Sequence, residues 1–354
     1  MQYVGIDQHK RHLTICVRNE QGDVVLRQQV STGWKKIDGF LEKRQDDAGQ
    51  VGGYVAVLEV CGFNHWLIRR LNQWGCRQVY LIAAPERARQ KTDRRDAAKL
   101  SELLWINRDR IAAGESLVHV KIVYQPTEDE QYDRQLTAMR RRLGQDLTRV
   151  KNAIGSVLRR HNLEQECPTK GAFTQKALRW LETVKLPKMD RMEMNAYLAQ
   201  YRLLVSQVKD MQDEIDRRAQ RQPVRACVRR VRTLPRIGNY TALALLAYIG
   251  SIKRFPNARS LANFFGLTPG CRNSGSTDRP GRITKAGHPL VRFLLGQMVL
   301  HVLRDDPSMR SWYQKIKRRR GTKIARVAVM RRLCEALWHM LTEEQDYRPA
   351  RGAA

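Results

Sequence analysis

The chain has 354 residues, enough for two or three domains with packed cores. Its 65 Lys and Arg residues against 35 Asp and Glu residues give a formal net charge of +30, which favours a polyanionic partner, most often nucleic acid. No apolar run reaches the roughly 18 residues that a membrane span requires, and the N-terminus leads into a strand pattern rather than a signal peptide. The seven cysteines show no metal-ligand spacing and are expected to be thiols of a reducing cytoplasm.

The N-terminal segment alternates between strand and helix patterns. Strands are expected over residues 1–8, 13–17, 24–30, 54–59 and 79–82. Helical spacing appears after the third strand and again over about 64–74, and a third helical run begins at Lys91. The first strand ends on Asp7 and the fourth on Glu59. This order of elements describes a sheet of the RNase H type, in which the first and fourth strands are neighbours and their terminal acids meet.

The third helical run adds Asp93 and Asp96, three residues apart on one helix face. Alone, such a pair in a basic protein is more often a solvated surface. Four carboxylates in one pocket, however, repel one another unless a divalent cation is present, and Mg²⁺ prefers carboxylate, phosphate and water oxygens. Two such ions about 3.5–4 Å apart stabilise both oxygens of a phosphodiester displacement. The acids together therefore favour metal-dependent phosphoryl transfer over ordinary strand-end and turn acids.

The middle of the chain predicts two long helices. The first carries an apolar heptad pattern at Leu136, Met139, Leu143, Leu147, Val150, Ile154 and Val157. The second, over about 194–221, has a similar stripe at Leu204, Val208, Met211 and Ile215. Both a helical hairpin that packs on itself and a dimerisation arm lying along nucleic acid fit this pattern, and the sequence favours neither.

The C-terminal segment holds two candidate phosphate-binding regions. The first is a turn between two helices, where Gly238 lets backbone amides approach a phosphate and Arg236 is a candidate nucleic-acid contact; an ordinary helix–turn–helix corner fits equally well. The second is a long loop over 266–289, whose length favours function or disorder. Its cations suit phosphate recognition: Arg272, Arg279, Arg282 and Lys285. Ser274 has no His or Asp nearby to activate it, so composition alone does not make it a nucleophile.

Beyond this loop, helices are expected over about 290–303 and 323–341. The basic run 315–320 is expected to separate them.

Several motifs are similar to those of one known family. Gly5-Ile6-Asp7 followed by Lys10, Glu59 in L-E-V-C-G, and Asp93-Arg94-Arg95-Asp96-Ala97 resemble the N-terminal RuvC-like domain of the DEDD insertion-sequence transposases of the IS-one-ten type. Residues 234–242, 255–267, 273–275 and 282–287 resemble the C-terminal transposase domain of that family. The resemblance covers roughly residues 1–105 and 229–305.

The resemblance implies a specific chemistry. The four acids (Asp7, Glu59, Asp93 and Asp96) would bind Mg²⁺, and Ser274 would be the nucleophile that joins covalently to a DNA end. The two sites would combine across subunits of a homodimer or homotetramer, and a structured bridge RNA would select donor and target DNA. Ser276 lies two residues away, so the choice of Ser274 depends on its pairing with Gly275.

The expected organisation is therefore α/β followed by α. A RuvC-like domain would span 1–125, a helical coiled-coil segment 126–225, a mainly helical transposase domain 226–345 and a flexible tail 346–354. The protein is expected in the bacterial cytoplasm at the nucleoid, away from membranes. Two alternatives to an RNA-guided recombinase stay open. A hydrolytic RuvC-like nuclease has no need for Ser274, and a non-catalytic nucleic-acid scaffold would tolerate loss of the acids.

Overall fold

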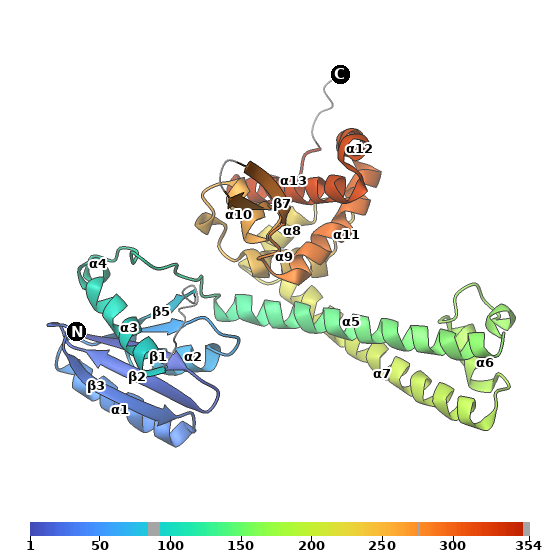
Figure 1. Cartoon of the computed structure of the whole chain (residues 1–354). Helices are drawn as coiled ribbons and strands as arrows, with labels where there is room; N and C mark the ends of the chain where they lie inside the picture. Colours follow the sequence, from blue (N-terminus) through green and yellow to red (C-terminus); the bar gives the residue numbers. More distant parts are fainter. Residues whose placement is uncertain (84–92, 275–276, 350–354) are drawn as a thin grey trace. The chain divides into compact units, whose positions relative to one another are not determined.

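The computed structural model describes the backbone of residues 1–83, 93–274 and 277–349, and side chains within these ranges except those of 93–95 and 271–280. The chain forms two compact units, Met1–Gln125 and Pro126–Ala354. The N-terminal unit is a sheet with helices on both faces, and the C-terminal unit is mostly helical (Figure 1).

Five strands form the sheet of the N-terminal unit. They are β1 (Gln2–Gln8), β2 (His12–Arg18), β3 (Val24–Ser31), β4 (Tyr54–Glu59) and β5 (Cys76–Ile82). Their order is β3-β2-β1-β4-β5; β1 to β3 form an antiparallel meander, whereas β4 is parallel to both β1 and β5. The predicted strands and the predicted neighbourhood of the first and fourth are confirmed.

Helices cover both faces of this sheet because the central strands carry apolar side chains on both faces. The helices are α1 (Trp34–Gly49), α2 (His65–Gln73), α3 (Asp93–Ile106) and α4 (Arg108–Ala112). Val4 and Ile6 belong to a core formed with α1 and α2. Tyr3 and Val57, of the opposite parity, belong to a core formed with α3. The predicted start of α3 at Lys91 lies outside the described residues.

The C-terminal unit begins with two long helices that pack against each other, α5 (Glu128–Arg160) and α7 (Lys188–Ala219) (Figure 1). A 3-10 turn (Glu164–Glu166) and α6 (Gln175–Thr183) lie between them in sequence. Much of the predicted apolar stripe is buried: Leu136, Leu143, Val150, Ile154 and Val157. Met139 departs from the prediction because its side chain is 42% exposed. The stripe is therefore filled within one chain, as the hairpin interpretation expects.

A buried ion pair joins these helices near the start of α5. Arg218 donates from Nε to Asp133 Oδ1 (2.8 Å) and from Nη2 to Asp129 Oδ1 (3.0 Å). Burial raises the pKa of Asp133, although the Arg218 guanidinium acts in the opposite direction. Removing one partner would leave a buried charge uncompensated, so the pair fixes how the two helices meet.

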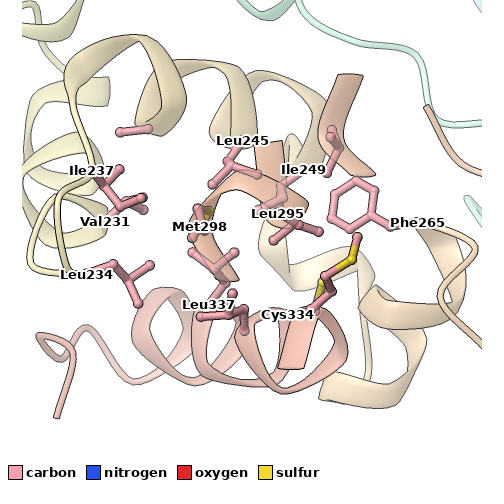
Figure 2. Close-up of a cluster of buried hydrophobic side chains, with 14 of the residues drawn as sticks. Val231, Leu234, Ile237, Leu245, Ile249, Phe265, Leu295, Met298, Cys334 and Leu337 are labelled. Carbon is pink, nitrogen blue, oxygen red and sulfur yellow. The ribbon is translucent and has the colours of Figure 1, made fainter. Parts of the chain in front are cut away.

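Shorter helices complete the C-terminal unit. They are α8 (Val224–Val231), α9 (Asn239–Ile249), α10 (Ala258–Phe264), α11 (Pro289–Asp305), α12 (Pro307–Arg320) and α13 (Thr322–Thr342), with a 3-10 turn at Ile252–Arg254. Figure 2 shows their common core, in which Val231, Leu245, Leu295 and Leu337 from four helices meet. Among the described residues, no helix is both long and apolar enough to cross a bilayer.

Two segments of this unit differ from the sequence-based expectation. Within 266–289, the predicted long loop contains an antiparallel hairpin of β6 (Pro269–Ser274) and β7 (Thr277–Ile283), because its backbone groups pair across the strands. The basic run 315–320 is the end of α12 rather than a break between helices. Asp306 caps α12 by accepting a hydrogen bond from Met309 N at 2.9 Å. The cations in the last turn of α12 interact favourably with the negative end of the helix dipole.

Candidate active site

Strand register places Asp7 beside Glu59. Ile6 pairs with Leu58 in the parallel β1–β4 ladder, so the next residue on each strand lies at the same carboxyl edge of the sheet. Because side chains alternate along a strand, Asp7 points to the same face as Tyr3, and Glu59 to the same face as Val57. This is the face that α3 covers.

The helix α3 approaches β1 closely because Gly5 has no side chain. A Cβ at Gly5 would lie 2.3 Å from Ala97 O and from Ser101 N. At the other end of α3, Trp105 Nε1 donates to Glu20 O (3.0 Å), and Glu20 pairs with the amino group of Met1. The helix therefore runs antiparallel to β1, and its first turn extends toward the strand end that carries Asp7.

That first turn contains the other two acids. Asp96 is partly buried, and the side chain of Asp93 lies outside the described residues. The structure thus brings Asp7 and Glu59 together and directs the backbone of the remaining acids toward them. Among the side chains it describes, no three His, Cys, Asp or Glu form a metal site. Paired carboxylates on one face nevertheless have the donor chemistry that a divalent cation requires.

Polar side chains that the sequence reasoning missed surround this edge. His9 Nε2 lies 3.0 Å from Asp7 Oδ2, and the Asp7 side chain is 18% exposed. The His9 ring stacks on His12 with centroids 4.6 Å apart. The spacing of Asp7 and His9, two residues apart at a strand end, was the available signal for this contact.

Asn64 links the ends of the two acid-bearing strands and is only 2% exposed. Its Nδ2 donates to Gln8 Oε1 (2.9 Å) and to Glu59 O (3.1 Å), and its Oδ1 accepts from Cys61 N (2.5 Å). Gln8 in turn donates from Nε2 to Phe63 O at 3.1 Å. A buried amide with its polar atoms satisfied in this way holds both strand ends in one arrangement.

The second candidate centre is the β6–β7 hairpin, in which Ser274 is the last residue of β6 and pairs with Thr277. Arg272 pairs with Arg279 on the same ladder. The side chains of these residues, and the whole of Ser276, lie outside the described part of the chain. Of the other predicted phosphate ligands here, Arg282 and Lys285 are exposed.

Glycine contacts fix the base of this hairpin. Gly266 has φ +67°, and a Cβ there would lie 2.3 Å from Ala286 N. A Cβ at Gly287 would lie 2.4 Å from Phe264 O. Side chains larger than hydrogen are therefore excluded where the hairpin leaves the helical core.

The other predicted nucleic-acid contacts differ in whether they already have a partner within the protein. Arg236 has φ +58° and donates from Nε to Asp305 Oδ2 at 2.7 Å, so its charge already has a partner. Gly238 is exposed at the N-cap of α9, whose first turn holds no acid. Lys10 is exposed in the β1–β2 turn, three residues after Asp7.

Comparisons with known proteins agree with this arrangement. A family model of DEDD IS110 transposases matches residues 4–163, and one described as the transposase IS116/IS110/IS902 family matches residues 228–314. A putative transposase of Sinorhizobium fredii is 26% identical over 99% of this chain and 87% of its own length. The transposase of insertion sequence element IS1111A from Coxiella burnetii is 25% identical over 98% and 92%. A probable family 20 transposase of Pseudomonas aeruginosa is 25% identical over 98% of both.

The acid-bearing sheet edge and these matches define a DNA transposase, an enzyme that acts on DNA. The chain belongs to the IS110-type insertion-sequence transposases. The DEDD domain of this family implies dependence on a divalent metal ion.

Proposed function

We propose that the N-terminal unit is a RuvC/RNase H-like catalytic domain in which Asp7, Glu59, Asp93 and Asp96 hold Mg²⁺. The register that puts Asp7 beside Glu59 on the α3 face carries this proposal. The strand order β3-β2-β1-β4-β5 supports the fold assignment. When bound, the metal offsets the repulsion of the carboxylates and stabilises charge on the reacting phosphate oxygens.

In this proposal, Ser274 is the nucleophile. Its Oγ loses a proton and attacks the phosphorus of a DNA phosphodiester, the bond from phosphorus to one deoxyribose oxygen breaks, and that oxygen takes up a proton. A hydroxyl of another strand later loses its proton and attacks the same phosphorus, the bond from phosphorus to serine Oγ breaks, and Oγ takes up a proton as the phosphodiester is restored. Cations and one backbone amide hold phosphates during these steps. The cations are Lys10, Arg236, Arg272, Arg279, Arg282 and Lys285, and the backbone amide is that of Gly238. For this, Arg236 exchanges Asp305 for a phosphate oxygen.

The proposal includes a structured guide RNA and a homodimer or homotetramer in which acids and serine of different subunits combine. The charge distribution supports a second polyanion, since residues 126–354 carry 45 basic and 21 acidic residues. The domains would be 1–125, a helical segment 126–225 and a transposase domain 226–345, followed by the tail 346–354.

A covalent adduct tests this mechanism. Full-length protein would be incubated with Mg²⁺, RNA transcribed from the flanking element and both DNA partners, then resolved under denaturing conditions. We expect a protein–DNA adduct in the wild type and in Ser276→Ala, and none in Ser274→Ala or Asp7→Asn. Cleavage without an adduct and unaffected by Ser274→Ala would identify a hydrolytic nuclease instead. Recombination unaffected by Asp7→Asn would point to a non-catalytic scaffold.

A further inference from the structure

The segment that joins α12 to α13 has a one-sided charge composition. Residues 307–334 contain ten Lys and Arg residues and no Asp or Glu. Seven of these cations lie close together in sequence around Gly321, and we refer to them as the basic corner: Lys315, Lys317, Arg318, Arg319, Arg320, Lys323 and Arg326.

The basic corner is exposed, and its charges have no partner among the described residues. All seven residues are exposed. Within the described part of the chain, none of their side chains has an ion pair, a side-chain hydrogen bond or a ring contact. The remaining cations of the segment are engaged. Arg310 donates to Leu303 O, Arg331 pairs with Glu335, and Arg332 lies over the Trp312 ring.

Packed helices hold the corner in place. Tyr313 in α12 and Ala325 in α13 belong to the main core of the C-terminal unit. Gly321 has φ +83° at the turn between the helices, a conformation that favours glycine. At the start of α12, Asp306 caps the helix and also accepts from Tyr347 Oη at 2.8 Å. Cations on such a scaffold lose little backbone entropy when they bind a ligand.

We propose that the basic corner binds the sugar–phosphate backbone of duplex DNA without reading its sequence. B-DNA carries one negative charge per ~1.7 Å of axis, so even a short stretch of duplex presents several phosphates to a cluster of cations. The seven exposed cations of the corner have the charge that such a backbone requires. This inference rests on the family's action on DNA and is independent of the acids and of Ser274.

Salt dependence of binding measures these contacts. Full-length protein would be titrated with a random-sequence 40-base-pair duplex across a series of NaCl concentrations. The test variant combines Lys317→Gln, Arg318→Gln, Arg319→Gln and Arg320→Gln. Each phosphate contact contributes about 0.9 to the slope of log K against log salt, so we expect the slope to fall by about 2–4 and the affinity to fall at least about tenfold near 0.1 M salt.

The matched control removes the same charge from arginines that already have acidic partners: Arg149→Gln, Arg159→Gln, Arg202→Gln and Arg217→Gln. We expect its slope to change by less than about 1. Equal losses in both variants would overturn the proposal, because net charge alone would then explain them. An unchanged slope in the corner variant would also overturn it. So would a loss confined to an RNA hairpin or to phosphatidylserine vesicles, measured in parallel.

Discussion

The acid-bearing edge and the serine hairpin differ in how the chain positions them. At the edge, two parallel strands of a five-stranded sheet end together, and Asn64 hydrogen-bonds to residues of both. The hairpin is a two-stranded sheet of its own, and backbone contacts at Gly266 and Gly287 fix its base.

This difference matches the chemistry proposed for each. A metal ion requires several oxygen ligands at about 2.0–2.1 Å, so the side chains that hold it must be fixed together. A nucleophile is a single group that has to reach a substrate already held elsewhere. A hairpin fixed at its base meets that requirement.

Removing an acid at the sheet edge should have the largest effect on activity. We expect Asp7→Asn to lower Mg²⁺-dependent strand joining by about 10³-fold or more, because the metal loses a charged ligand. Asp46→Asn, an exposed acid on α1, is the control and should retain full activity. Joining would be measured in single-turnover assays. Comparable activity of the two variants would contradict an acid-based metal site.

Filling the space at Gly5 should separate α3 from the sheet. We expect Gly5→Ala to lower the free energy of unfolding by about 3 kcal/mol, because its Cβ would overlap Ala97 O and Ser101 N. In Gly39→Ala, the new methyl meets nothing within 4 Å, and this helix-interior change should be neutral or stabilise by about 0.5–1 kcal/mol. Urea unfolding followed by circular dichroism gives both values; similar midpoints would contradict the close approach of α3.

Removing the Asn64 amide tests whether the strand ends depend on it. Asn64→Ala should cost about 2 kcal/mol, since buried partners such as Gln8 Oε1 lose a donor. Beyond this loss, the Mg²⁺ concentration for half-maximal activity should rise, which a purely structural defect would not cause. Asn72→Ala, on the exposed side of α2, is the matched control. An unchanged Mg²⁺ requirement in Asn64→Ala would limit this residue to a structural role.

His288 lies next to the base of the hairpin. Its protonation should have the smallest effect, a modest loss of stability at low pH. Burial, followed by the charges of Arg134, Arg292 and Arg141, lowers the pKa of His288. Its Nδ1 accepts from Leu290 N at 3.3 Å to cap α11, and its ring stacks on Tyr248.

As the pH falls below about 6.5, the unfolded chain takes up this proton first, so the stability present at higher pH is lost as the pH falls through the lowered pKa. His288→Asn keeps a capping side chain that does not titrate. Its melting temperature should fall less than that of the wild type between pH 7 and pH 5.5. Parallel curves would contradict a lowered pKa for His288.

Local patterns were enough to predict that Asp7 and Glu59 lie at neighbouring strand ends, but not which residues hold these ends together. Asp7 and Glu59 end apolar strands, and the order of elements made those strands neighbours. Asn64 was missed because its contact with Gln8 joins residues 56 positions apart, which no local pattern records. The composition of the hairpin, rich in Gly, Ser and Pro, predicts a loop, whereas its structure depends on pairing between two strands.

The α12 helix was missed for a different reason. The basic run at its end is typical of an exposed loop, although the sequence also contains a helix start signal, the N-cap residue Asp306 followed by Pro307 at the first helical position.

The helix α7 has two opposite apolar faces, and only one of them faces α5. Met194, Leu198 and Tyr201 fill the core between the helices. On the reverse side, exposed residues recur at steps of three and four: Met189, Met192, Ala196, Ala199 and Leu203. Most of the predicted heptad of α5 is buried inside the monomer. A second subunit that docked on this face of α7 would therefore meet the outward stripe. Charged substitutions meant to dissociate an oligomer belong there, because the same changes in the inner seam would unfold the arm itself.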